Sequence, residues 1–237
     1  FAPDSRRLAL LTARMVPAGL WYAIGYINGG GLNLRWFRDL VQRLGGGRVT
    51  DYAELDEWAA RAEPGSGGLI FVPHLGGRVC PNQPDVRGGW LGLTWSHGVE
   101  HLYRALLESV AYEYAFYLDV ERELIPSVTF DEVRVVGGGS RSAVWNQIKA
   151  DVLGIPYVQL NVTEAAALGA AILAGHGVGV FEDWEASVAR FTRPVRRFEP
   201  DGNATARYRP LAAYYRSLLE EHEALWRQLS QARTTGT

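Results

Sequence analysis

Hydrophobic residues along the chain follow two spacings, one typical of strands and one typical of helices. Residues 20–28 (LWYAIGYIN) are rich in aromatic and β-branched side chains, which predicts a strand. Residues 32–44 and 51–62 place apolar side chains on one helical face, and runs of three glycines flank the first of these helices. The runs 69–73 and 88–94 indicate two short strands, because a loop rich in glycine and proline separates them.

The middle of the chain shows the clearest order. Residues 98–123 carry an apolar stripe at helical spacing and predict a long helix. A strand at 132–136, a helix at 140–153, a strand at 157–160 and a helix at 163–174 are predicted to follow. This alternation of strands and helices indicates an α/β fold.

The two ends of the chain differ in clarity. A helix near Trp184, a strand at 195–198 and a long helix at 211–229 complete the prediction, whereas the first nineteen residues show no clear pattern. The chain opens at Phe1 without an initiating methionine. We therefore expect a chain that begins in the middle of a fold.

Composition excludes several classes of protein. With 47% hydrophobic and 11% aromatic residues, the 237-residue chain has too much apolar content for a disordered protein. Its formal net charge of −2 gives no general attraction to nucleic acid, and no apolar stretch reaches the ~20 residues of a membrane helix. A single cysteine and no visible export signal predict a cytoplasmic protein without an internal disulfide.

Two residue types that occur once narrow the chemistry. Lys149 is the only lysine, so no Walker A loop exists and a Schiff base could form only there. Because Lys149 lies in a helical pattern, we expect its side chain to be solvated. Cys80 lies near His74 in the sequence, which leaves a cysteine nucleophile open, but a small buried or loop thiol is the favoured interpretation.

A turn of three glycines, Gly137, Gly138 and Gly139, lies between a predicted strand and a predicted helix. Such a turn lets the backbone approach a ligand, and the free N–H groups at the start of a helix attract an anion. A nucleotide is the natural ligand, and a plain strand-to-helix turn is the alternative. A dinucleotide site is disfavoured, because Ser142 stands where that motif has its third glycine and the next strand ends without an acidic residue.

A different chemistry would use His97, Glu100 and His101, which match the H-x-x-E-H pattern of inverted zinc proteases. Gly98 places His97 at a helix cap rather than inside the helix, and no strong third ligand follows, although Glu108 and Glu113 are candidates by type. We therefore expect polar residues at a helix start without a bound metal. A zinc hydrolase stays as the disfavoured alternative.

Four ordered stretches carry a family resemblance. They are GYINGGGLNLRWFRD (25–39), FVP with RGGWLGLT and RALLESVA (71–111), GGGSRS with WNQ and AD (137–151), and EAAALGAAILAG (164–175). Their order and spacing resemble the C-terminal half of the FGGY family of carbohydrate kinases, which includes glycerol, xylulose, gluconate and ribulose kinases. Each stretch is weak alone, but the ordered set is specific.

The resemblance implies a ribonuclease-H-like, actin-like ATPase domain over residues 1–237. Its core is expected at about 20–180, followed by a helical C-terminal extension at about 181–237. It also implies ATP and Mg²⁺ as cofactors. The N-terminal sugar-binding domain of the family is expected to be absent from this chain, and the helix at 163–174 matches an element that contacts that domain.

The resemblance also assigns site residues. In family terms Gly137, Gly138, Gly139 and Ser142 line the adenine and ribose, and Gly31 matches a position near the phosphates. No catalytic residue is assigned, because the family's phosphate loop and base aspartate lie upstream of the first residue by alignment. Phosphoryl transfer needs that base, a magnesium ion and an enclosed cleft. Aspartates at 85 and 151 are the nearest by type, but neither matches the base position.

The expected activity is ATP-dependent phosphorylation of a sugar, with a ketopentose such as xylulose first. The wording GGGSRS-x-x-W-N-Q and the EAAALGAA helix look more like xylulose kinases than glycerol kinases. A non-catalytic nucleotide-binding domain of the same fold is the second hypothesis. The expected partners are ATP or ADP, a sugar and the N-terminal domain. A homodimer stays open, and neither nucleic acid nor a membrane is expected.

Overall fold

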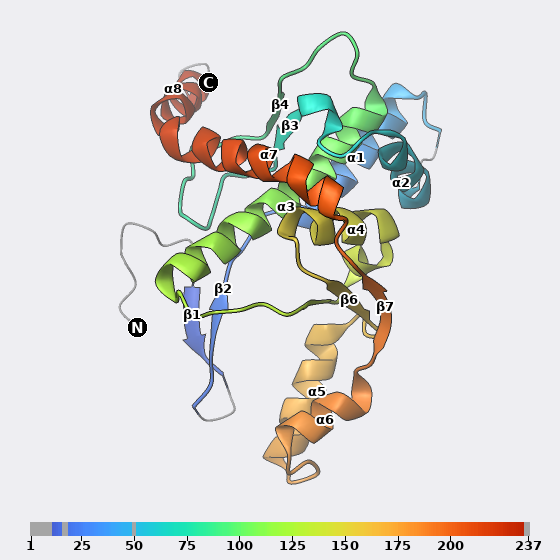
Figure 1. Ribbon diagram of the computed structural model, residues 1–237, viewed down its shortest axis with the longest axis vertical. Coiled ribbons are helices and arrows are strands. Elements are labelled where there is room, and N and C mark those ends of the chain that lie inside the picture. Colours follow the sequence, from blue (N-terminus) through green and yellow to red (C-terminus); the bar gives the residue numbers. More distant parts are fainter. Residues whose placement is uncertain (1–10, 16–18, 49–50, 235–237) are drawn as a thin grey trace.

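The computed structural model describes residues 11–15, 19–48 and 51–234 (Figure 1). Within these ranges short strands form three sheets: β1 (Leu11–Arg14), β2 (Trp21–Ile24), β3 (Ile70–Val72), β4 (Gly89–Leu91), β5 (Val133–Val135), β6 (Tyr157–Leu160) and β7 (Pro194–Phe198). β1 pairs with β2 and β3 with β4, both antiparallel. The third sheet has the order β5-β6-β7, with β5 and β6 parallel. A parallel pair needs a crossover, which α4 supplies.

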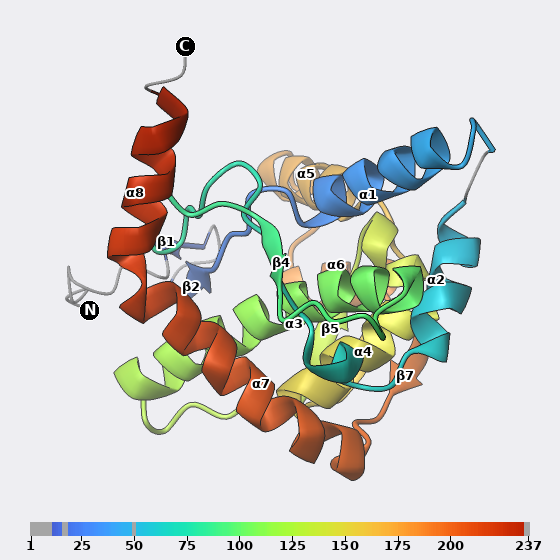
Figure 2. The same ribbon diagram turned by 90° about the horizontal axis from the view of Figure 1, so that it is seen from above.

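The helices surround one long central helix, α3. They are α1 (Gly30–Leu44), α2 (Tyr52–Arg61), α3 (Val99–Leu124), α4 (Ala143–Leu153), α5 (Ala165–Gly177), α6 (Trp184–Phe191), α7 (Gly202–Glu221) and α8 (Glu223–Thr234). Helix α3 packs against α1, α2, α4 and α7, and the view from above shows these helices around it (Figure 2). The main hydrophobic core therefore lies along α3, where Leu106, Leu107 and Val110 are fully buried.

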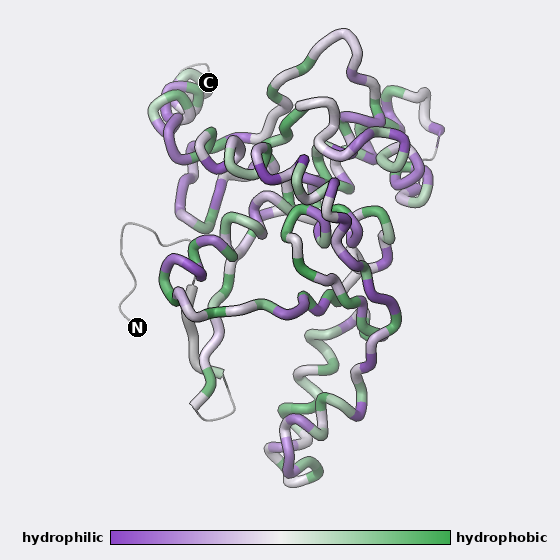
Figure 3. The backbone as a smooth tube through the Cα atoms, in the orientation of Figure 1, coloured by the Kyte–Doolittle hydropathy of each residue, from purple (hydrophilic) through white to green (hydrophobic). Residues whose placement is uncertain are grey.

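Helices α5 and α6 project away from this core at the bottom of Figure 1. The residues of α5 are mostly apolar, as the hydropathy colours show (Figure 3). Yet Ile172 is the one buried residue of α5. The small side chains of α5 are thus largely exposed in this chain.

Local capping explains where several helices begin. The side chains of Asp51, Ser142, Asp183 and Asp201 accept a backbone N–H at the starts of α2, α4, α6 and α7. The cap at Ser142 sets the start of α4 at Ala143, whereas the sequence pattern predicted a helix from residue 140. Residues 138–141 form a 3-10 turn instead.

Two other elements differ from the sequence prediction. Strand β1 lies in the first nineteen residues, where the sequence predicted no element, because the four residues LTAR are too short a run to stand out by their alternation. Helix α7 begins at Gly202 rather than at 211 and contains Pro210. Because a proline usually ends or starts a helix, the sequence prediction began this helix just after Pro210, whereas the helix runs through the proline. No helix in the described ranges is long and apolar enough to cross a membrane.

The C-terminal residues contribute to the same packing. β7 pairs antiparallel with β6, and α7 packs on α3 and α4. Tyr208 and Tyr215 of α7 are fully buried in the main core.

Candidate functional site

A cavity of about 670 Å³ lies beside the glycine turn. Residues of α1, α2, α3, β5, α4 and β6 line it. Gly31, Gly138, Gly139 and Ser142 all lie in its wall, so one cavity brings together four of the residues that the sequence assigned to a nucleotide. Gly137 is not part of the lining, although it begins the turn.

Hydrogen bonds hold the turn in one conformation. Gly137 has a φ of 85°, which glycine adopts without strain. The Ser140 hydroxyl donates to the Gly137 carbonyl at 2.7 Å, and the Asn146 side-chain amide donates to the Ser140 carbonyl at 2.7 Å. The Ser142 hydroxyl accepts from the Trp145 N–H at 3.0 Å. The cavity wall is therefore preorganised by the first turn of α4.

The glycines of the turn have different roles. A Cβ at Gly138 would meet nothing within 4 Å, and the same holds for Gly31. A Cβ at Gly139 would lie 2.7 Å from the Trp145 ring. Gly139 is thus required for packing of the protein itself, whereas Gly138 leaves open space that a ligand could fill.

Asp56 and Lys149 are two ionisable side chains of the cavity wall whose pKa values are shifted by burial. Burial raises the pKa of Asp56 in α2, and a hydrogen bond with Ser142 partly offsets that effect. Burial also lowers the pKa of Lys149 in α4 to about 7. The expectation that Lys149 is solvated is wrong, since the residue is only 3% exposed. Lys149 lies one helical turn after Trp145, on the face of α4 that packs inward.

Aromatic side chains form much of the remaining wall. Tyr103 and Tyr114 come from α3 and Tyr157 from β6, and burial raises the pKa of each hydroxyl. Sequence reasoning missed these tyrosines and Asp56, because they come from separate elements that only the tertiary fold brings together. For Lys149 a local signal existed, because a residue four positions after Trp145 lies on the same face of the helix.

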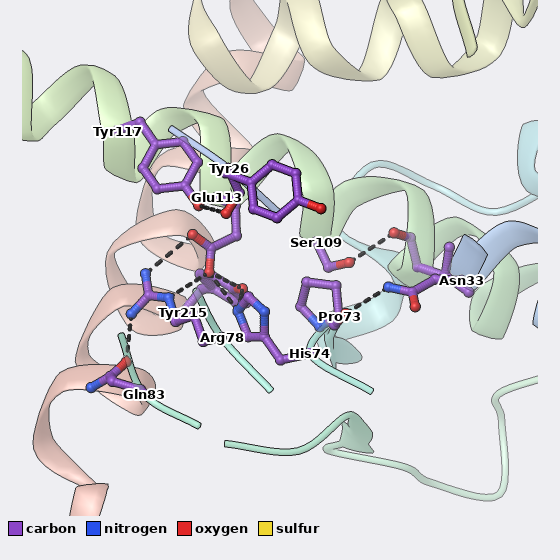
Figure 4. A network of polar contacts seen from close by, with 11 residues as sticks. Tyr26, Asn33, Pro73, His74, Arg78, Gln83, Ser109, Glu113, Tyr117 and Tyr215 are labelled. Carbon is purple, nitrogen blue, oxygen red and sulfur yellow. Dashed lines mark hydrogen bonds and ion pairs between the residues drawn. The ribbon is translucent and has the colours of Figure 1, made fainter. Parts of the chain in front are cut away.

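The lone cysteine lies in a small cluster of buried apolar side chains. Cys80 is buried and packs with Phe116 and Tyr117, which confirms the prediction of a buried thiol. Its neighbour in sequence, His74, instead places Nε2 2.6 Å from Oε1 of Glu113 (Figure 4). The imidazole therefore belongs to a buried polar network.

That network surrounds Glu113, which is fully buried in α3. Nη2 of Arg78 donates to Oε2 of Glu113 at 3.1 Å, and the Tyr215 hydroxyl donates to Oε1 at 3.0 Å. Arg78 also donates to the Gln83 side chain at 2.9 Å (Figure 4). The network ties the loop between β3 and β4 to α3 and α7.

The two aspartates that the sequence raised as possible bases lie outside the cavity wall. Asp151 is 6% exposed, and one carboxylate oxygen accepts from the Gln147 side chain and from the Asp201 N–H, both at 2.8 Å. It therefore holds the start of α7. Asp85 lies in the loop between β3 and β4 and does not line the cavity.

The histidines of the HGVEH segment make local hydrogen bonds. Nδ1 of His97 accepts from the Thr94 N–H at 2.9 Å, and Nδ1 of His101 accepts from the Gly98 N–H at 3.1 Å. Within the described ranges no three histidine, cysteine or acidic residues form a group that could hold a metal ion.

We expect the purified protein to hold no stoichiometric zinc, because the described residues supply no third ligand beside this pair. Elemental analysis of the metal-to-protein ratio tests this. One tightly held zinc per chain, lost in a His97→Ala, His101→Ala double variant, would restore the hydrolase hypothesis.

Comparison with known proteins gives the context of this cavity. The model of the FGGY family of carbohydrate kinases, C-terminal domain, matches residues 6–178. A gluconokinase of Bacillus subtilis is 34% identical over 220 residues, covering 89% of this chain and 42% of that protein. A glycerol kinase of Ralstonia pickettii is 37% identical over 182 residues, covering 76% and 35%. The chain thus spans less than half the length of these relatives.

Solved structures agree. The xylulose kinase from Rhodospirillum rubrum superimposes with a TM-score of 0.76 at 27% identity, over 92% of this chain and 43% of that one. This confirms the predicted α/β, actin-like ATPase fold. With the family model covering most of the chain and the fold shared with a solved kinase, this chain belongs to the FGGY family of carbohydrate kinases, as its C-terminal domain.

Proposed function

We propose that this chain is the nucleotide-binding half of an ATP-dependent sugar kinase. The observation that carries the proposal is the cavity walled by Gly138, Gly139 and Ser142. Its volume of about 670 Å³ lies in the ordinary range for small-molecule sites. Aromatic walls suit a purine, and open space at Gly138 lets a ligand approach the backbone.

The residues present fit ATP better than they fit a metal ion on its own. The turn and the start of α4 would hold the nucleotide through backbone N–H groups, and the Asp56 carboxylate would accept from hydroxyl or amino groups. Mg²⁺ usually keeps several waters and needs few protein ligands beside the phosphates. We therefore propose that Mg²⁺ arrives with the nucleotide. When bound, it neutralises phosphate charge during transfer.

The proposed acceptor is a hydroxyl group of a small sugar, with the ketopentose xylulose as first candidate. The motif wording of the sequence and the likeness to a solved xylulose kinase support this choice. Gluconokinase and glycerol kinase are the curated relatives with higher identity, so gluconate and glycerol are the competing acceptors. Most sugar contacts are proposed to come from an N-terminal domain, which the exposed small residues of α5 would contact.

Replacing Gly138 by valine is expected to weaken ADP binding by about 1 to 3 kcal/mol while the fold stays intact. The new side chain enters space that is empty in the protein but belongs to the proposed ligand. Isothermal calorimetry measures the affinity, and thermal unfolding measures the stability.

Gly139→Val is the matched control, since its Cβ would press on Trp145 and should lower stability. Equal ADP affinity in wild type and Gly138→Val would show that the nucleotide site lies elsewhere.

A further inference from the structure

Lys149 is a buried basic residue of the cavity wall, and burying an ammonium group costs free energy that the fold itself does not return. It is 3% exposed and lines the cavity, and burial is the only cause of its lowered pKa, with no hydrogen bond or carboxylate among the described residues to offset it. Nζ lies 3.6 Å from the ring centroid of Trp145 and 5.7 Å from that of Tyr157. Such contacts with aromatic faces return only part of the cost of removing a charge from water.

The second charged group of the cavity interior lies apart from Lys149. Asp56 interacts with Ser142 at the start of α4, and its field reaches Tyr103. Lys149 lies two turns further along α4, and no carboxylate contributes to the perturbation of its ammonium. The cavity interior therefore has an acidic group at one place and a cationic group at another, whereas Arg141, the other cation of the lining, is exposed.

A nucleotide has a matching polarity. Its ribose hydroxyls and exocyclic amino group are hydrogen-bond donors, whereas its phosphates are anionic acceptors. A carboxylate attracts the donors and repels the phosphates, and a buried ammonium does the reverse. Only one orientation of the ligand satisfies Asp56 and Lys149 together.

We propose that Lys149 binds the phosphate end of the nucleotide, while the nucleoside end lies beside Asp56 and Ser142. This inference rests on the proposed function and adds a ligand-binding residue that neither the glycine turn nor the family resemblance assigned. The bound phosphate supplies the acceptor that Lys149 lacks in the free protein.

Phosphate binding at Lys149 has a proton-linked consequence. Because its pKa is about 7, much of the population holds a neutral amine above neutral pH. A phosphate favours the ammonium, so ADP binding takes up a proton there. Other titratable or charged groups that share the cavity are Tyr52, Asp56, Tyr103, Tyr114, Arg141 and Tyr157.

Three tyrosines of the cavity keep one charge state over that pH range. The hydroxyls of Tyr103, Tyr114 and Tyr157 have raised pKa values and stay neutral. Burial raises the pKa of Asp56 and lowers that of Lys149, so the two groups shift in opposite directions. Lys149 is therefore the group whose proton should respond.

Calorimetry of ADP and adenosine tests the proposal with wild type, Lys149→Met and Arg209→Met. Arg209 is exposed on α7 outside the cavity wall, so its variant controls for the loss of a basic side chain at a distance from the ligand. Lys149→Met is expected to weaken ADP binding about ten- to hundredfold and to leave adenosine binding unchanged. Arg209→Met should change neither affinity.

Wild type alone provides a second measurement that no folding defect can disturb. Titration near pH 8 in buffers of different ionisation enthalpy should show uptake of up to about one proton per ADP and none per adenosine. The second phosphate ionisation, with a pKa of about 6, is complete at that pH and adds little.

Three results would overturn the proposal. One is equal ADP affinity in wild type and Lys149→Met, and another is wild-type ADP binding without proton uptake. The third is an equal loss of adenosine and ADP affinity in Lys149→Met, which would place the nucleoside at this residue. If wild type bound neither ligand, the proposed function itself would fail together with this inference.

Discussion

Replacing Glu113 by glutamine is expected to lower the free energy of unfolding by about 3 to 5 kcal/mol. The carboxylate is fully buried and receives hydrogen bonds on both oxygens. Glutamine keeps one carbonyl oxygen but turns an NH₂ group toward either the Arg78 guanidinium or the His74 and Tyr215 side. Arg78 can only donate, so this variant leaves a buried positive charge without its counter-charge.

Glu108→Gln is the matched control, because Glu108 is equally buried in the same helix. Its Oε1 accepts from Gly65 N–H, Arg104 and Tyr208, and a carbonyl oxygen can keep those bonds. Arg104 would lose its counter-charge, but it still donates to the Ala59 carbonyl and the Tyr208 hydroxyl. Its Oε2 faces only the Ser66 hydroxyl, which can accept from an NH₂ group instead. The expected loss is therefore about 1 to 2 kcal/mol.

The two carboxyl groups should also differ in pH dependence. Burial alone would raise the pKa of Glu113, but Arg78 and His74 outweigh it and the pKa is lowered. At Glu108 burial prevails over Arg104 and the pKa is raised. A lowered pKa stabilises the folded state above the unfolded-state pKa of about 4.3 and loses that effect as pH falls through the folded value. A raised pKa, as at Glu108, stabilises the folded state below the unfolded-state pKa and loses that effect as pH rises through the folded value.

Urea unfolding of wild type and both variants, at neutral pH and at acidic pH, measures these differences. The deficit of Glu113→Gln should shrink on acidification, because the wild-type carboxylate becomes protonated. The deficit of Glu108→Gln should instead grow or stay level. A larger deficit for Glu108→Gln than for Glu113→Gln at neutral pH would contradict this account of the network.

The contrast between these glutamates shows what local sequence patterns contain. Helix α3 was predicted almost to its ends, because its apolar stripe is a local feature. Glu108 and Glu113 had been considered only as ligands for an unlikely zinc ion. Their partners lie in distant segments, such as Tyr208 at a separation of 100 residues and Tyr215 at 102. The spacing of apolar residues along one helix cannot predict contacts with segments so distant in the sequence.

The site shows the same limit. The glycine turn could be predicted because three consecutive glycines between a strand and a helix serve few other purposes. Gly31 also lines this cavity. Its assignment to the nucleotide site came from the family resemblance, because no spacing of residues in the sequence links it to the glycine turn. Lys149 was misjudged because a lysine in a helix is usually solvated, and only the packing of α4 on the core buries it.

Phosphoryl transfer is expected to be absent from this chain by itself and present in an intact kinase that carries it. The reaction depends on positioning and on charge stabilisation in an enclosed site. Within the described residues the only carboxyl group that lines the cavity is Asp56, which lies beside the proposed nucleoside end. A missing general base commonly costs about 10² to 10⁴ in rate, and lost positioning costs more.

Coupled release of ADP, measured with xylulose, ribulose, gluconate and glycerol on the chain and on the intact kinase, separates the hypotheses. Xylulose is expected to be the preferred acceptor of the intact protein. Turnover by the chain alone would mean that a base lies within these residues and that the assignment of the sugar site to another domain is wrong. An intact kinase that accepts glycerol but no pentulose would keep the family and overturn the substrate. ADP binding by the intact protein without turnover on any acceptor would favour the non-catalytic domain, because the cavity would then serve recognition without chemistry.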